Sequence, residues 1–122
     1  MSKKILNYFE LKDVCRSAGL WFVGSFMMEF LERREMWADS KRKPEFIAYM
    51  YYEFMNGIDS DITGTRTRVN CVIRIIESKM VKDALELVLE ANDEKLDCPE
   101  SKINAQETLD NIKAGKYEWY KE

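Results

Sequence analysis

The chain has 122 residues, of which 46% are hydrophobic and 34% are charged; this balance excludes a disordered chain and is typical of a globular protein. Its length suits one domain with its own core. The formal net charge is −3 and the isoelectric point is near 5.2, so we do not expect the large basic face that extended duplex DNA requires.

Apolar residues at helical spacing predict a first helix over residues 5–18, ended by a glycine. A second helix is expected over residues 20–37. Its first half is apolar on most of its circumference, which is typical of a helix in the centre of a bundle or in an interface. Pro44 suits a first helical position, so we expect a third helix over residues 44–56, with Gly57 as a left-handed cap.

The next apolar residues have the i, i+3, i+4, i+7 spacing of an amphipathic helix: Val69, Val72, Ile73 and Ile76. A further apolar pattern follows directly, so we expect residues 68–92 to form an antiparallel helix hairpin joined near residues 78–80. The β-branched run VNCVIRII also suits a strand. We favour the helix because Asn70 and Arg74 fall on one face, opposite the apolar stripe.

Pro99 opens a last expected helix, which ends at Gly115. The stretch KYEWYKE then follows as a tail or a short docking segment. The sequence thus predicts an all-α fold, namely a compact bundle of five to six helices in a single domain over residues 1–122.

The stretch DSDITGTRTRVNCVIRII, residues 59–76, places Arg66 and Arg68 beside the expected helix start near Thr67. The first turn of a helix presents unpaired N–H groups and the positive end of the dipole. An arginine there costs about 0.3–1 kcal/mol unless a negative group offsets it. Thr67 is a suitable N-cap, and Gly64 would let a ligand approach the backbone closely.

Two sources of that negative charge are open. Asp59 and Asp61 can turn back to pair with the arginines, which would be a structural solution. Alternatively, a phosphate or carboxylate of a ligand binds at the helix start. The stretch is neither a Walker A loop nor a GxGxxG motif. The ligand-binding residues expected in the second case are Gly64, Thr65, Arg66, Thr67, Arg68, Asn70 and Arg74.

Two neighbouring features bear on a binding function. The basic run KRK at residues 41–43 can attract phosphates, although short basic loops are usually ordinary surface. The adjacent YMYYEF offers rings that could stack on bases, yet its spacing suits a core or interface helix. The interface residues expected there are Phe46, Tyr49, Tyr51 and Tyr52.

The absence of histidine excludes every mechanism that uses an imidazole as general base, proton shuttle or metal ligand. Cys15, Cys71 and Cys98 are too far apart for a zinc motif and too few for a disulfide framework. We therefore expect no enzymatic activity, no cofactor and no metal. Glutamates on successive turns of residues 29–35 suit a metal site, but interleaved arginines make a solvated helix face the better interpretation.

The longest uncharged run, residues 17–28, is too short to cross a bilayer, and the first residues do not resemble a secretory signal. We therefore expect no membrane association and a reducing, cytoplasmic location.

The sequence therefore predicts a small, non-enzymatic binding protein that recognises or sequesters a phosphate-bearing ligand at the helix start near Thr67. This ligand would be a phosphorylated small molecule, a nucleotide or a nucleic-acid phosphate. The alternative is a protein–protein interaction or inhibitor module that forms a homo-oligomer through helices 20–37 and 44–56.

Overall fold

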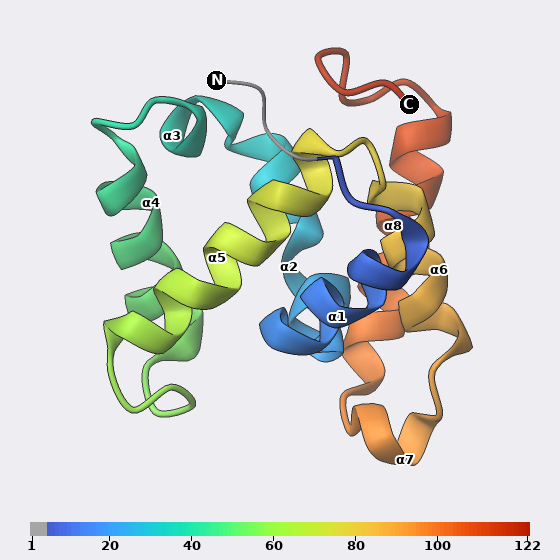
Figure 1. The fold of residues 1–122 in the computed structure, drawn as a ribbon, viewed down its shortest axis with the longest axis horizontal. Coiled ribbons are helices and arrows are strands. Elements are labelled where there is room, and N and C mark those ends of the chain that lie inside the picture. Colours follow the sequence, from blue (N-terminus) through green and yellow to red (C-terminus); the bar gives the residue numbers. More distant parts are fainter. Residues whose placement is uncertain (1–4) are drawn as a thin grey trace.

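The computed structural model describes residues 5–122, and the regular secondary structure in that range is entirely helical (Figure 1). Its elements in chain order are α1 (Tyr8–Ala18), α2 (Leu20–Glu32), α3 (Arg34–Ala38), α4 (Lys43–Met50), the π-helical turn η1 (Tyr51–Met55), α5 (Ile62–Glu77), α6 (Val81–Glu90), α7 (Asp93–Leu96) and α8 (Pro99–Lys113). The predicted all-α fold is confirmed. The strand considered for VNCVIRII is wrong, because those residues lie inside α5.

Helix α2 is the centre of the bundle and contacts α1, α5, α6 and α8. Its largest fully buried side chains are Phe22, Phe30, Met27, Leu31 and Val23. Gly24 permits a close approach to two neighbours, since a Cβ there would lie 2.8 Å from the Ser101 carbonyl oxygen and 2.6 Å from Val88 Cγ1. The apolar circumference of this helix therefore faces a core within the chain.

The expected helix over residues 20–37 is divided into α2 and α3. The division falls at Arg33, whose φ of −119° and ψ of 35° depart from helical values. After this break Trp37 turns back toward α2, where its Nε1 donates a hydrogen bond to the Phe30 carbonyl at 2.8 Å. Together with the short α7, this division explains why the bundle has more helices than the sequence predicts.

Figure 1 shows α3, α4 and α5 on one side of the bundle and α6, α7 and α8 on the other, with α1 and α2 between them. The predicted turn at residues 78–80 is confirmed, and Lys79 there has a φ of 60°. Helices α5 and α6 follow one another across this turn and contact each other. Each helix has its main packing partner elsewhere, since α5 packs mainly against α1 and α6 against α8.

Several helix ends follow local sequence signals. Pro44 and Pro99 lie in the first turns of α4 and α8. Glycines with positive φ follow α1, η1 and α8, namely Gly19 at 89°, Gly57 at 94° and Gly115 at 75°. These ends are confirmed as predicted. Within residues 5–122, none of the helices has the length and apolarity needed to cross a bilayer.

The stretch KYEWYKE docks on the bundle, one of the two outcomes expected for it. Tyr117 and Tyr120 are 6% and 3% exposed. Trp119 Nε1 donates a hydrogen bond to the Leu31 carbonyl at 2.9 Å, and its ring centroid lies 5.9 Å from that of Trp37. This segment therefore brings two tryptophans together beside α3.

Replacement of Gly24 by alanine tests the close packing of α2. Alanine is favoured over glycine in a helix by about 1 kcal/mol, so propensity alone predicts stabilisation. The new methyl group would lie 2.8 Å from a backbone oxygen of α8, so we expect the free energy of unfolding to fall by about 1–3 kcal/mol. Urea denaturation measures this change. An unchanged or raised midpoint would contradict the close approach, and Ser17→Ala on the exposed face of α1 is the control.

Candidate functional site

The helix that carries the predicted site begins earlier than expected. Helix α5 starts at Ile62, and the carboxylate of Asp61 caps it by accepting a hydrogen bond from the Thr63 backbone N–H at 2.8 Å. Residues 65–68 therefore lie beyond the first turn, where backbone N–H groups bond to carbonyls of the same helix. The predicted helix start near Thr67 is thus wrong.

Arg68 is held by an internal ion pair. Its Nη2 lies 3.1 Å from Asp59 Oδ1, and its Nη1 donates a hydrogen bond to the Ala18 carbonyl at 2.6 Å. Asp59 also accepts a hydrogen bond from the Thr65 hydroxyl at 2.8 Å. The Arg68 and Asp59 side chains are 22% and 8% exposed, so solvent screens the pair weakly. Of the two aspartates expected to pair with the arginines, Asp59 therefore pairs with Arg68. Asp61 instead caps the helix.

Two glycines leave space for the cluster formed by Arg68, Asp59 and Thr65. A Cβ at Gly64 would lie 3.1 Å from Asp59 Cγ, and one at Gly19 would lie 2.6 Å from Arg68 Nη1. The guanidinium carbon of Arg68 also lies 5.3 Å from the centroid of the Trp21 ring. Gly64 therefore makes room for an internal carboxylate, whereas the sequence suggested the approach of a ligand.

The remaining predicted binding residues differ in what they offer a ligand. Thr65 is buried, and the Thr67 hydroxyl donates to a carbonyl of its own helix at 3.3 Å. Arg66, Asn70 and Arg74 are exposed and fall at i, i+4 and i+8, on one face of α5. Within residues 5–122, the side chains of these three residues form no hydrogen bond or ion pair. This face of α5 is therefore the part of the predicted site that remains available.

A pocket of about 370 Å³ lies between the beginning of α4 and the C-terminal half of α5, and we call it the Lys43 pocket. Lys43 from α4 and Asn70 and Arg74 from α5 line it, together with the apolar Ile5 and Ile73. Lys43 is the last residue of the basic run noted in the sequence. Across the part of the chain that the structure describes, neither Lys43 nor Arg74 has an ion-pair partner. The Lys43 pocket is thus lined by two cations that have no ion-pair partner among residues 5–122.

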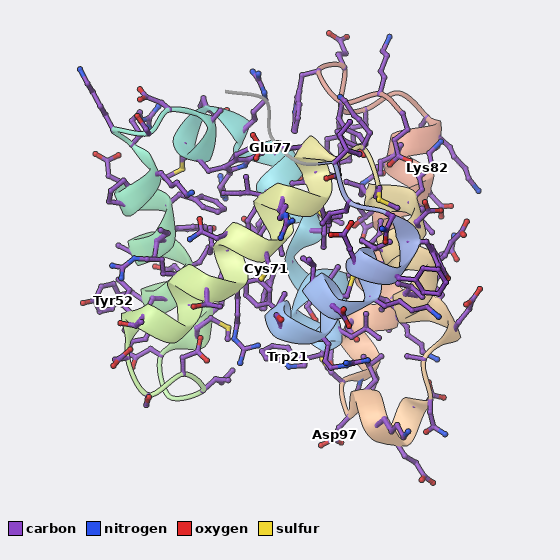
Figure 2. All side chains as sticks on the ribbon, in the orientation of Figure 1. Trp21, Tyr52, Cys71, Glu77, Lys82 and Asp97 are labelled. Carbon is purple, nitrogen blue, oxygen red and sulfur yellow. The ribbon has the colours of Figure 1, made fainter. Side chains whose placement is uncertain are left out.

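A second pocket, of about 450 Å³, adjoins the first, because Lys43, Ile73 and Glu77 line both. Its further lining includes Arg34, Trp37, Lys79 and Trp119, and we call it the tryptophan pocket. The two pockets together form the α4–α5 groove. Glu77, which lines both pockets, lies at the C-terminal end of α5 in Figure 2.

The sequence singled out Asn70 and Arg74 but missed their neighbours in the groove. Arg34 and Lys79 carried no motif, and the basic run at residues 41–43 was the one signal for Lys43. These cations come from separate elements, so their meeting depends on how α3, α4 and α5 pack.

The aromatic residues expected at an interface are mostly used inside the chain. Phe46 is fully buried, so its prediction as an interface residue is wrong. The Tyr49 hydroxyl donates a hydrogen bond to Glu29 at 3.1 Å, and burial raises the pKa of this tyrosine. Tyr51 is half-buried, with its ring centroid 5.0 Å from that of Tyr52. Tyr52 is 67% exposed and lies at the outer edge of the α4 side in Figure 2.

Other candidates for chemistry have structural roles. Glu29 pairs with Arg33 at 2.9 Å, an i, i+4 pair of the kind expected on this helix face. Burial, with a smaller contribution from nearby Cys71, raises the pKa of Cys15 to about 12, and burial also raises the pKa of Cys71. Both thiols are therefore protonated at neutral pH. Among residues 5–122, no group of three or more His, Cys, Asp or Glu side chains is placed to hold a metal ion.

The groove combines cations, a free amide and aromatic surface in one half-enclosed space. Comparison of the chain with known protein families, with curated proteins and with solved structures finds no match in any of the three. The function of the groove is therefore inferred from its own residues.

Substitution of Arg68 or Asp59 tests the internal ion pair. We expect Arg68→Met and Asp59→Asn each to lower the free energy of unfolding by about 2–4 kcal/mol, because the remaining charge stays in a weakly solvated place. The double variant should lose less than the sum of both. Urea denaturation of the four proteins measures this coupling, and additive losses would argue against the pair. Arg66→Ala, on the exposed face of α5, is the control and should change stability by less than about 0.5 kcal/mol.

The raised pKa of Cys15 predicts a dependence of stability on pH. The folded protein keeps this thiol protonated up to about pH 12, whereas an ordinary thiol ionises near 9.0, so the contribution to stability is complete below 9.0 and is lost as the pH rises toward 12. Iodoacetamide should accordingly modify native Cys15 at least about tenfold more slowly than Cys15 in urea. Peptide mass spectrometry measures both rates, and equal rates would contradict the burial of this thiol.

Proposed function

We propose that this protein binds a phosphate-bearing ligand in the α4–α5 groove and does not convert it chemically. The observation that carries the proposal is the pairing of Lys43 and Arg74 as walls of one pocket, without an ion-pair partner for either among residues 5–122. The Lys43 and Arg74 side chains line the same pocket, so an anion bound between them would contact one cation from α4 and one from α5.

The charge of the groove supports an anionic ligand. The cations that line it are Arg34, Lys43, Arg74 and Lys79, and the carboxylate is Glu77. Like charges that line one half-enclosed space repel one another, and a bound anion would offset this repulsion. A groove lined mainly by one sign of charge also raises the local concentration of counter-ions.

The neutral donors of the Lys43 pocket favour phosphate over a smaller anion. The Asn70 side chain supplies amide N–H donors. The Ser78 hydroxyl lines the same pocket and accepts a hydrogen bond from the Leu6 backbone N–H at 3.2 Å, so its own proton is available for a ligand oxygen. A terminal phosphate group offers three acceptor oxygens to such a set of donors, and charge-assisted bonds from Lys43 and Arg74 would strengthen the contact.

Binding without conversion is consistent with the side chains present. The chain has no histidine, and the raised pKa values of Cys15 and Cys71 leave both thiols as poor nucleophiles at neutral pH. Recognition or sequestration of the ligand is therefore the activity that we propose.

Removal of charge from the Lys43 pocket tests this function. We expect Lys43→Ala and Arg74→Ala each to weaken the binding of ADP and of inorganic pyrophosphate about tenfold, because each removes a charge-assisted contact. Isothermal titration calorimetry measures both probes, and affinity should fall as ionic strength rises.

The matched controls are Lys41→Ala, in the same basic run, and Arg66→Ala, on the same face of α5; neither residue lines the groove. Both should bind the probes as the parent protein does. Equal losses in all four variants would mean that general surface charge drives binding, and absence of binding by both probes would refute the function.

A further inference from the structure

The tryptophan pocket presents ring carbon to a ligand. The Trp37 and Trp119 rings meet at 66°, with 5.9 Å between their centroids. Each indole N–H already donates to a backbone carbonyl, Trp37 to that of Phe30 and Trp119 to that of Leu31. Trp37 is 6% exposed, so the partly exposed Trp119 supplies most of the aromatic surface, and the guanidinium carbon of Arg34 lies 5.1 Å from the centroid of the Trp119 ring. An aromatic surface with no spare donor suits a planar aromatic group.

We infer that the ligand is a nucleotide, with its phosphate in the Lys43 pocket and its base in the tryptophan pocket. This inference rests on the proposed function and narrows it. The pockets measure about 370 and 450 Å³, within the range of small-molecule sites, roughly 300–1,000 Å³. Because Lys43, Ile73 and Glu77 line both pockets, one ligand can extend from the first into the second.

Glu77 favours a nucleotide over a simple anion. Glu77 lines both pockets, and the other charged residues of the groove are cations. An ionised carboxylate accepts hydrogen bonds at about four positions, so it accommodates a ligand donor in addition to its existing contact. A ribose hydroxyl or an exocyclic amine supplies such a donor. Pyrophosphate supplies negative oxygens, which the carboxylate repels.

A nucleic-acid strand is a poorer occupant of this groove than a single nucleotide. Strand binding draws on many phosphate contacts along a continuous basic surface. Here the formal net charge is −3, and residues 83–122 hold 11 acidic against 5 basic side chains. Most of these acidic residues belong to α6–α8, which Figure 1 places on the side of the bundle away from α3 and α4, so the surface on that side would repel a longer polyanion.

The probes are ADP, inorganic pyrophosphate and a short single-stranded oligonucleotide, each titrated into the full chain. Calorimetry measures affinity, and tryptophan fluorescence reports on the base pocket. We expect ADP to bind at least about tenfold more tightly than pyrophosphate, a difference of the size expected for one base–aromatic contact. We also expect ADP to change the fluorescence and pyrophosphate to leave it unaltered.

Two variants address the base pocket directly. Ala38 is exposed and lines the tryptophan pocket, so Ala38→Leu should fill the pocket and lower the ADP affinity to that of pyrophosphate. Trp119→Phe should reduce the ADP-induced fluorescence change. Trp21→Phe is the control, because Trp21 lines neither pocket and lies apart from Glu77 in Figure 2, so its replacement should not affect that change. If Trp119→Phe fails to fold, Ala38→Leu decides the test.

The outcomes separate the two proposals. Equal affinity for ADP and pyrophosphate, unaffected by Ala38→Leu, would overturn the nucleotide inference and leave the phosphate site intact. Tighter binding of the oligonucleotide than of ADP would also overturn the inference. Absence of binding by all three probes would overturn both the inference and the proposed function.

Discussion

The ion pair between Arg68 and Asp59 is the contact on which the course of α5 depends. It joins α5 to the loop that carries Asp59 and, through the Ala18 carbonyl, to the end of α1. Gly19 and Gly64 leave the space that this cluster needs. Since the N-terminal half of α5 is fixed in this way, the direction of its C-terminal half is set, and the groove beside α4 follows from that direction.

Local signals made much of the fold predictable. Proline at a first helical position and glycine after a last one act through their own backbone geometry, so Pro44, Pro99, Gly19, Gly57 and Gly115 marked helix boundaries correctly. Local signals did not predict the first residue of α5. Both Asp61 and Thr67 are acceptable N-caps. What distinguishes them is the contact between Asp59 and Arg68, which depends on the folded loop.

The candidate groove was predictable only in its separate parts. The sequence indicated an exposed polar face at Asn70 and Arg74 and a basic run ending at Lys43. It did not indicate that these two segments lie next to each other in the folded protein. These parts meet because α4 packs on α5. The contact between Trp37 and Trp119 was also not predictable from the sequence. It depends on the division of residues 20–37 at Arg33 and on the docking of the C-terminal stretch.

A cation near the start of a helix needs a negative group to offset the helix dipole, and this need is greater for Lys43 than for the arginines of α5. Arg68 has a carboxylate partner, and Arg74 lies in the last turns of α5, where the helix dipole favours a cation by about 0.3–1 kcal/mol. Lys43 is the first residue of α4, where the dipole disfavours a cation, and among residues 5–122 it has no ion-pair partner. Folding therefore accounts for Arg68 and in part for Arg74. It does not account for Lys43, and a bound phosphate at this helix start would.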